Sequence, residues 1–262
     1  MSQLESVCDL STFQSDILNE RSLQFFRATE TAETLKPIDE RLEILLKLLA
    51  PHLLDQAAHK VLEYLIRIYE VHVYHKSLVL NAFLPLFETA YFLRMIQLLN
   101  LERDQEYGFL HQFAYEGKAI DKATLVKCLR RNSGLIFTKY AEFSFSLLDL
   151  VGIEENAAAN HHWKFYGSMM VEVLRAGADD QNLMFNCLPF ISKSLKQKSV
   201  RDLQIAGFLA VSQLACRKTL SEEYTQAFLR QTLQTVGSIE LADEELRLKG
   251  MTVLLFLAMY QG

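Results

Sequence analysis

The stretch PIDERLEILLKLLAPHLLDQAAHKVLEYLIRIY, from Pro37 to Tyr69, decides the fold class. Its first half carries apolar side chains at the i, i+3, i+4, i+7 spacing of one helix face. These residues are Leu42, Leu45, Leu46 and Leu49. Pro37 suits the first turn of a helix, and Pro51 ends the pattern. The first half therefore predicts an amphipathic helix between Pro37 and Ala50.

The second half repeats the spacing after a very short connection. Asp55 can cap this helix, whose apolar residues are Ala58, Val61, Leu62, Leu65 and Tyr69. Two helices joined so tightly lie roughly antiparallel, and each apolar arc is wider than one partner helix can cover. Further helical layers are therefore expected.

Helical spacing continues along the rest of the chain. It recurs in residues 92–99, 125–129, 143–150, 163–174, 181–195 and 203–214. A last pair is expected at 221–236 and 243–257, with Ser221 and Asp243 as N-caps, and the polar stretches 28–36 and 102–106 are expected to be loops. The pattern predicts roughly ten to twelve helices in all.

Composition excludes other classes of protein. With 10 Gly and 4 Pro in 262 residues, the chain has too few turn formers for an all-β fold. Its net charge of −5 argues against a generally basic coat for nucleic acid. No basic segment followed by an apolar run begins the chain, and the longest apolar run, 251–260, is far below the roughly 18 residues that span a bilayer. The sequence predicts neither a secreted nor a membrane-spanning protein.

The cysteines indicate a reducing compartment. Cys8, Cys128, Cys187 and Cys216 lie far apart without C-x-x-C spacing, mostly among apolar residues. This arrangement is typical of reduced thiols in a protein core.

A comparison of the chain with itself indicates repeats. Superposing Ala206, Leu209 and Ala210 on Gly250, Val253 and Leu254 needs a shift of about 44 residues, within the roughly 40–47 of HEAT and armadillo repeats. The predicted fold class is therefore all-α, a HEAT/armadillo-like α-α superhelix built as a helix-pair solenoid. A compact helical bundle is the alternative. Because no linker rich in Pro, Gly or Ser divides the chain, residues 1–262 are predicted to form a single all-helical HEAT-like region.

No catalytic, cofactor or metal site is predicted. His59, His72 and His75 could approach one helical face, but no further ligands complete a familiar zinc spacing. His161 and His162 are adjacent, so they point in different directions and are expected on a helix surface. No nucleophile elbow and no phosphate-binding glycine loop is present.

One group of charges is a candidate contact for RNA or a protein partner. It combines four residues across a predicted turn, Lys193, Lys196, Lys198 and Arg201. The alternative is an ordinary solvated turn, since the sequence interleaves no aromatic residue for base stacking. A second basic group, Lys122, Lys127, Arg130 and Arg131, has the same two interpretations. Phe25, Phe26, Phe143 and Phe145 are spaced as core residues.

The segment from His59 to Leu99 carries a family resemblance. Its motifs are Leu62-Glu63-x-Leu65-Ile66, His72-x-Tyr74, Leu84-Pro85-x-Phe87-Glu88-Thr89 and Arg94-x-x-Gln97-Leu98-Leu99. They resemble the N-terminal region of the large HEAT-repeat scaffolds of the U3 small nucleolar ribonucleoprotein, members of the t-UTP (UtpA) subcomplex of the small-subunit processome. Because these scaffolds are far longer, we expect the chain to be a fragment or a truncated gene product.

The resemblance implies a non-catalytic nucleolar scaffold without cofactors. It implies a role in ribosome biogenesis, namely pre-rRNA processing, small-subunit rRNA maturation and rDNA transcription. The implied partners are other t-UTP and processome subunits, with pre-rRNA or snoRNA contacted directly or indirectly, and neither a membrane nor a small-molecule substrate. An importin-like or other HEAT-repeat adaptor is the alternative, because fold alone does not fix function.

Overall fold

The computed structural model describes residues 10–150, 156–177, 179–217 and 220–261, and these form helices and turns without a strand. The chain divides into two compact units. Unit 1 comprises the described residues of Met1–Asp121 and Phe145–His161, and unit 2 those of Lys122–Ser144 and His162–Gly262. None of the helices in the described ranges combines the length and apolar character that crossing a bilayer requires.

Unit 1 begins with the helix pair that the Pro37–Tyr69 stretch predicts. Its helices are α2 (Ser11–Gln14), α3 (Ala32–Leu49), α4 (Gln56–Tyr69), α5 (Val71–Tyr74), α6 (Lys76–Phe83), α7 (Ala90–Leu98) and α8 (His111–Glu116). Every apolar residue predicted for α3 and α4 is buried. The short 3-10 helices Glu20–Gln24, Arg27–Thr29, Ala50–His52, Leu84–Leu86 and Gly108–Leu110 complete the unit.

The predicted ends of α3 and α4 are partly wrong. The α3 helix begins at Ala32, upstream of Pro37, because the Thr31 side chain caps it by accepting from the Thr34 N–H. About half of the expected 28–36 loop is therefore helical. At the other end, Pro51 follows the helix as predicted. Asp55 holds the N-cap position of α4, but its side chain accepts no capping hydrogen bond.

A partly buried polar group ties α3 to the segments before and after it. Arg27 Nη2 lies 2.5 Å from Asp39 Oδ2, and His75 Nε2 lies 3.1 Å from Asp39 Oδ1. Burial by itself would raise the pKa of Asp39, but the hydrogen bonds from Arg27 and His75 outweigh it and hold the pKa below its ordinary value.

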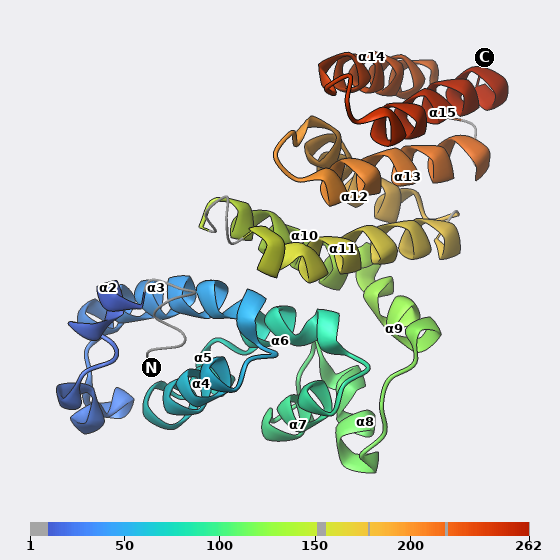
Figure 1. Ribbon diagram of the computed structural model, residues 1–262. Helices are drawn as coiled ribbons and strands as arrows, with labels where there is room; N and C mark the ends of the chain where they lie inside the picture. The colour runs from blue at the N-terminus through green and yellow to red at the C-terminus, as the bar shows by residue number, and fades with distance from the viewer. Residues whose placement is uncertain (1–9, 151–155, 178, 218–219, 262) are drawn as a thin grey trace. The chain divides into compact units, whose positions relative to one another are not determined.

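Unit 2 is a stack of helix pairs (Figure 1). Its helices are α9 (Lys122–Leu129), most of α10 (Arg131–Leu148) and α11 (Asn156–Ala176), α12 (Gln181–Lys196), α13 (Arg201–Arg217), α14 (Glu222–Ser238) and α15 (Glu244–Gln261). The α12–α13 pair packs on the α14–α15 pair, with α12 against α14 and α13 against α15. The first helix of one pair thus packs on the first helix of the next pair, and the second helix on the second. This packing is typical of helix-repeat proteins, in which each repeat contacts its neighbours.

Side-chain hydrogen bonds join the first helices of these pairs. Gln231 of α14 donates to the Ser192 carbonyl at 2.8 Å, and the Thr235 hydroxyl donates to the Leu195 carbonyl at 2.9 Å. The preceding helix α11 is joined to α12 in a similar way, since the Tyr166 hydroxyl of α11 lies 3.0 Å from the Ser194 hydroxyl of α12. Neighbouring layers are thus held in register by polar contacts as well as by apolar packing.

Small residues bring the second helices of successive pairs together. A Cβ on Gly167 of α11 would lie 2.9 Å from the Ala206 Cβ of α13. A Cβ on Gly250 of α15 would lie 3.0 Å from the Phe208 ring of α13 and 2.3 Å from Val236 of α14. The pairing of Ala206 with Gly250 in the repeat comparison therefore reflects two close helix contacts.

The backbone near the start of α10 is kinked. Asn132, Ser133 and Gly134 all have positive φ, at 50°, 53° and 78°. Asn186 of α12 donates to the Ser133 carbonyl at 2.9 Å, and a Cβ on Gly134 would lie 2.4 Å from Leu183 of α12. This left-handed run therefore fits closely against the next layer.

The last helix has two apolar faces. Leu246, Gly250, Val253 and Leu257 are buried, whereas Leu248, Met251, Leu255 and Met259 form an exposed stripe, each more than half exposed. The corresponding helix of the preceding pair, α13, is buried on most sides, although Leu209 is 49% exposed.

Candidate interaction surface

The three lysines of the candidate group lie together at the end of α12. Lys193 and Lys196 occupy its last turn, Lys198 follows in the connection to α13, and all three are exposed. We call these three residues the lysine turn. Cations in the last turn of a helix are favoured by its macrodipole, so Lys193 and Lys196 also stabilise α12. The Lys193 Nζ lies over the Phe190 ring, 5.7 Å from its centre, and this cation–π contact helps to hold the lysine side chain in place.

Arg201 is held by a different set of partners. It lies 3.2 Å from Asp243 and 2.7 Å from Glu245, both at the start of α15. Hydrogen bonds from Lys249 and Arg201 lower the pKa of Glu245 to about 2. The charge of Arg201 is therefore compensated within unit 2. These acids are more than forty residues away in the sequence, so turn composition alone could not reveal the pairing.

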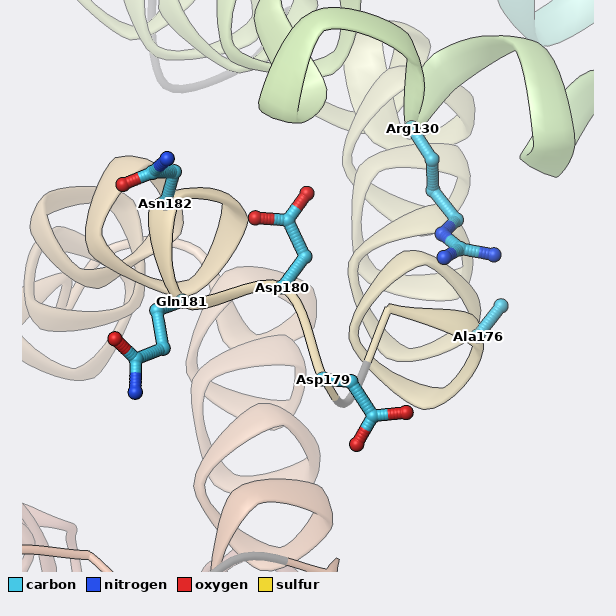
Figure 2. Close-up of a pocket in the computed structure, with 6 residues that line it drawn as sticks. All are labelled: Arg130, Ala176, Asp179, Asp180, Gln181 and Asn182. Atoms are coloured by element: carbon cyan, nitrogen blue, oxygen red, sulfur yellow. The ribbon is translucent and has the colours of Figure 1, made fainter.

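The second basic group does not form one patch. Lys122 lies 3.4 Å from Glu172, Lys127 and Arg131 are exposed, and Arg130 turns inward. Arg130 lines an open cavity of about 580 Å³ together with Ala176, Asp179, Asp180, Gln181 and Asn182. Figure 2 shows Arg130 beside Ala176, while Asp179 and Asp180 project from the connection between α11 and α12.

The charge of this cavity is mixed. Asp180 is also the N-cap of α12 and accepts from the Leu183 N–H at 3.0 Å. With two carboxylates around one guanidinium, the cavity presents no net positive field to a polyanion. The lysine turn is therefore the stronger of the two cationic candidates.

Two of the three histidines considered for a metal site, His59 and His75, have structural partners. His59 Nε2 lies 2.6 Å from the Leu53 carbonyl, and His75 pairs with Asp39. Across the described residues, no three His, Cys, Asp or Glu side chains are grouped in a way that could hold a metal ion.

Some residues expected at the surface or in the core are placed differently. His162, expected on a surface, is fully buried, with its carbonyl accepting from Tyr140 Oη at 3.1 Å. Phe143 is buried as expected, but Phe26 is 65% exposed. Adjacent positions on a helix within a layered array can both be covered, which spacing alone does not show.

Of the three cysteines in the described residues, two are buried and one is exposed. Cys128 and Cys187 lie in the core, and burial raises the pKa of the Cys187 thiol to about 12, so it stays protonated. Cys216 is exposed, contrary to the expectation of a core thiol. Cys8 lies outside the described residues.

The motifs of the family resemblance mostly serve the fold. Leu62, Leu65 and Leu84 are buried, and the Thr89 side chain caps α7 by accepting from the Phe92 N–H at 3.3 Å. Leu84 and Thr89 shape the turn between α6 and α7, so these motif residues support the architecture and not a binding surface.

Packed helix pairs of this kind define the class as an all-α, HEAT-like helix-repeat protein. No family model matches the chain. It is similar to human HEAT repeat-containing protein 1, at 25% identity over 87% of the chain and 11% of that protein. It is also similar to U3 small nucleolar RNA-associated protein 10 of Schizosaccharomyces pombe, at 28% identity over 80% of the chain and 12% of that protein.

A third relative is U3 small nucleolar RNA-associated protein 10 of Pyricularia oryzae, at 25% identity over 87% of the chain and 13% of that protein. The chain thus spans 11 to 13% of the length of these three homologues. The family resemblance and the HEAT-like fold class predicted from the sequence are both confirmed.

Proposed function

We propose that this chain acts as a non-catalytic HEAT-repeat scaffold in ribosome biogenesis. In this proposal it works in the nucleolus as part of the t-UTP (UtpA) subcomplex of the small-subunit processome and supports pre-rRNA processing, small-subunit rRNA maturation and rDNA transcription. The supporting observation is the similarity, over 80 to 87% of the chain, to two relatives named as U3 small nucleolar RNA-associated.

The architecture fits such a role. Stacked helix pairs expose a long series of helix faces, on which several proteins can dock side by side. The proposal takes residues 1–262 as one HEAT-like region, with other processome subunits as its main partners. It assigns no reaction, no cofactor and no small-molecule substrate.

Within this function, the lysine turn is the proposed contact with pre-rRNA, snoRNA or an acidic partner. Lys193, Lys196 and Lys198 present exposed positive charge within one turn of chain. Arg201, the fourth member of the candidate group, is already paired with Asp243 and Glu245, so it contributes less. Because the chain is net acidic, affinity for RNA from this turn alone is modest.

The test replaces Lys193, Lys196 and Lys198 with Ala in the tagged protein expressed in cells, with Arg201→Ala as the matched control. Copurification of U3 snoRNA and processome proteins reports the scaffold role, and RNA crosslinking reports the contact. Loss of RNA crosslinks in the triple variant alone supports the lysine turn. Each lysine that binds a phosphate should, once replaced, reduce the salt slope of RNA binding by about 0.7. Absence of U3 snoRNA from the wild-type purification would refute the scaffold role.

A further inference from the structure

The exposed stripe of α15 is a contiguous apolar surface. Its members follow one another at helical spacing of three or four residues, so they share one face, and each is between 52% and 72% exposed. The opposite side of α15 packs on α13 and α14 (Figure 1). A row of large apolar side chains in water is typical of a surface that contacts a partner.

The repeat register shows which face of the repeat this stripe occupies. The shift of 44 residues that places Ala206 on Gly250 also relates a set of α13 residues to a set of α15 residues. In this register Gln204, Phe208, Val211 and Ala215 fall on Leu248, Thr252, Leu255 and Met259. The four α13 residues are at most 4% exposed, whereas the four α15 residues are exposed.

The buried face of α13 is the one that meets α15. The Phe208 ring lies 3.0 Å from the position of a Cβ on Gly250, and the Ala215 carbonyl accepts from Gln261 Nε2 at 2.7 Å. The α15 helix therefore presents outward the same face with which α13 contacts α15. Because an uncovered last repeat normally has a polar outer face, an apolar face in this register is a stacking face whose occupant is another helix.

The charges of α15 favour a second α15 helix as that occupant. All four of its charged residues lie before Gly250, namely Glu244, Glu245, Arg247 and Lys249. When two such helices pack antiparallel, the charged half of each lies beside the uncharged half of the other, so like charges stay apart. The cations also approach the C-terminal end of the other helix, whose last turn has no basic residue.

The same orientation matches the apolar side chains. With the two stripes centred on each other, Leu248 of one copy faces Met259 of the other. Thr252 of one copy faces Leu255 of the other in the same way. The stripe is therefore complementary to itself, as a contact about a two-fold axis requires.

Head-to-tail stacking of copies matches less well. The exposed positions of α3, the first long helix described, are largely polar and include Glu33, Lys36, Glu40 and Glu43. Against that surface the apolar stripe would meet charges. Contact between two identical stripes pairs apolar with apolar and closes as a dimer.

We propose that two copies of this chain associate through the exposed stripes of their α15 helices, packed antiparallel about a two-fold axis. This inference goes beyond the proposed function. The scaffold role is tested by copurification of U3 snoRNA, so it can hold or fail whatever the oligomeric state of the chain.

The molar mass of the whole chain in solution tests the proposal. Sedimentation equilibrium should show a mass that rises with concentration from 30.1 kDa toward twice that value. Because one helix from each copy makes a small interface, we expect a Kd on the order of 10 μM. Leu255→Glu should remain monomeric, and Leu209→Glu, at a leucine of α13 that is 49% exposed, is the matched control and should dimerise as the wild type does.

Mixed variants separate loss of the contact from loss of the fold. Chains with Leu255→Glu and chains with Leu255→Lys should each be monomeric alone and should dimerise when mixed, because opposite charges then meet near the two-fold axis. A stripe that binds some other surface of the chain would show no such rescue. Helical circular dichroism and the thermal midpoint of each variant check the fold.

Crosslinking tests the antiparallel order. In a Cys216→Ser background, a short bis-maleimide should join chains with Leu248→Cys to chains with Met259→Cys. It should not join two chains that both carry Leu248→Cys, because in the antiparallel pair these positions lie about eleven residues apart along the axis, roughly 16 Å. The Cys216→Ser chain alone gives the background.

Three results would overturn the inference. A mass of 30.1 kDa at every concentration would leave the stripe to a helix of a different protein. A dimer that Leu255→Glu leaves intact, or a mixture of the two charged variants that stays monomeric, would place any contact on another face. Crosslinks between like positions would refute the antiparallel order.

Discussion

Ala206 occupies a contact that leaves no room for a larger side chain. It is 2% exposed, and it faces Gly167 so closely that even a methyl group on that glycine would lie 2.9 Å away. Ala206→Leu should therefore destabilise the chain by about 1–3 kcal/mol, because overpacking forces side chains and backbone to shift.

Denaturant unfolding of this variant checks the prediction. The matched control is Ala258→Leu, the same change at an exposed position of α15, which should stay within about 0.5 kcal/mol of the wild type. An unchanged midpoint for Ala206→Leu would mean that the α11–α13 contact is looser than described.

The lowered pKa of Asp39 should make the free energy of unfolding depend on pH in the acid range. Its pKa is lowered in the folded state by Arg27 and His75, against the effect of burial. A lowered folded-state pKa means stabilisation that is present above the ordinary pKa of 3.8 and is lost as the pH falls through the folded-state value.

Asp39→Asn should accordingly lower the thermal midpoint at neutral pH, and the difference from the wild type should shrink as the pH falls below about 3.8. Thermal unfolding followed from neutral to acidic pH measures this difference. Asp149→Asn, at an exposed position, gives the size of an ordinary surface change. A difference that stays constant down the acid range would contradict the pairing with Arg27 and His75.

At the scale of helices, the left-handed run near the start of α10 is a point of high sensitivity. Gly134 has φ of 78°, which a side chain tolerates poorly, and a Cβ there would also meet Leu183 at 2.4 Å. Gly134→Ala should therefore cost about 1–3 kcal/mol of stability. Gly237→Ala is the matched control, because Gly237 is helical with open space around it, and it should be stabilising by about 0.4–1 kcal/mol. Equal effects in chemical denaturation would refute the close fit of this turn.

The ion pairs of Arg201 link α13 to the start of α15. Because these side chains are largely exposed, Arg201→Gln should lower stability by no more than about 1 kcal/mol, and added salt should reduce the loss. Urea unfolding at low and high salt, compared with Lys198→Gln, measures this contribution. A larger effect of Lys198→Gln would show that the pairing is misassigned.

The elements that could be predicted are those with strong spacing or a clear cap. The apolar stripes of α3 and α4 are buried as predicted, and Ser221 and Asp243 cap α14 and α15. The start of α3 escapes prediction because Pro37 marks a helix start more strongly than the Thr31 cap does, although Pro is also tolerated further inside the N-terminal end. Arg201 could be assigned only once the structure brought it to Asp243 and Glu245, since long-range ion pairs leave no local pattern.

At the scale of the whole chain, the described residues are helices joined by turns, without a strand. The far-ultraviolet circular dichroism spectrum should therefore be that of a helical protein, and it should be lost in thermal unfolding. A spectrum dominated by strand would contradict the HEAT-like class that the homologues and the helix pairs share.

The exposed stripe of α15 makes that helix the part of the described chain most open to methionine oxidation. Met251 is 52% exposed and Met259 is 72% exposed, whereas Met169 and Met170 are almost completely covered. Peroxide converts an accessible thioether to a sulfoxide, which is polar. Met251 and Met259 should therefore be oxidised well before Met169 and Met170. Each oxidation would make part of the exposed apolar stripe polar.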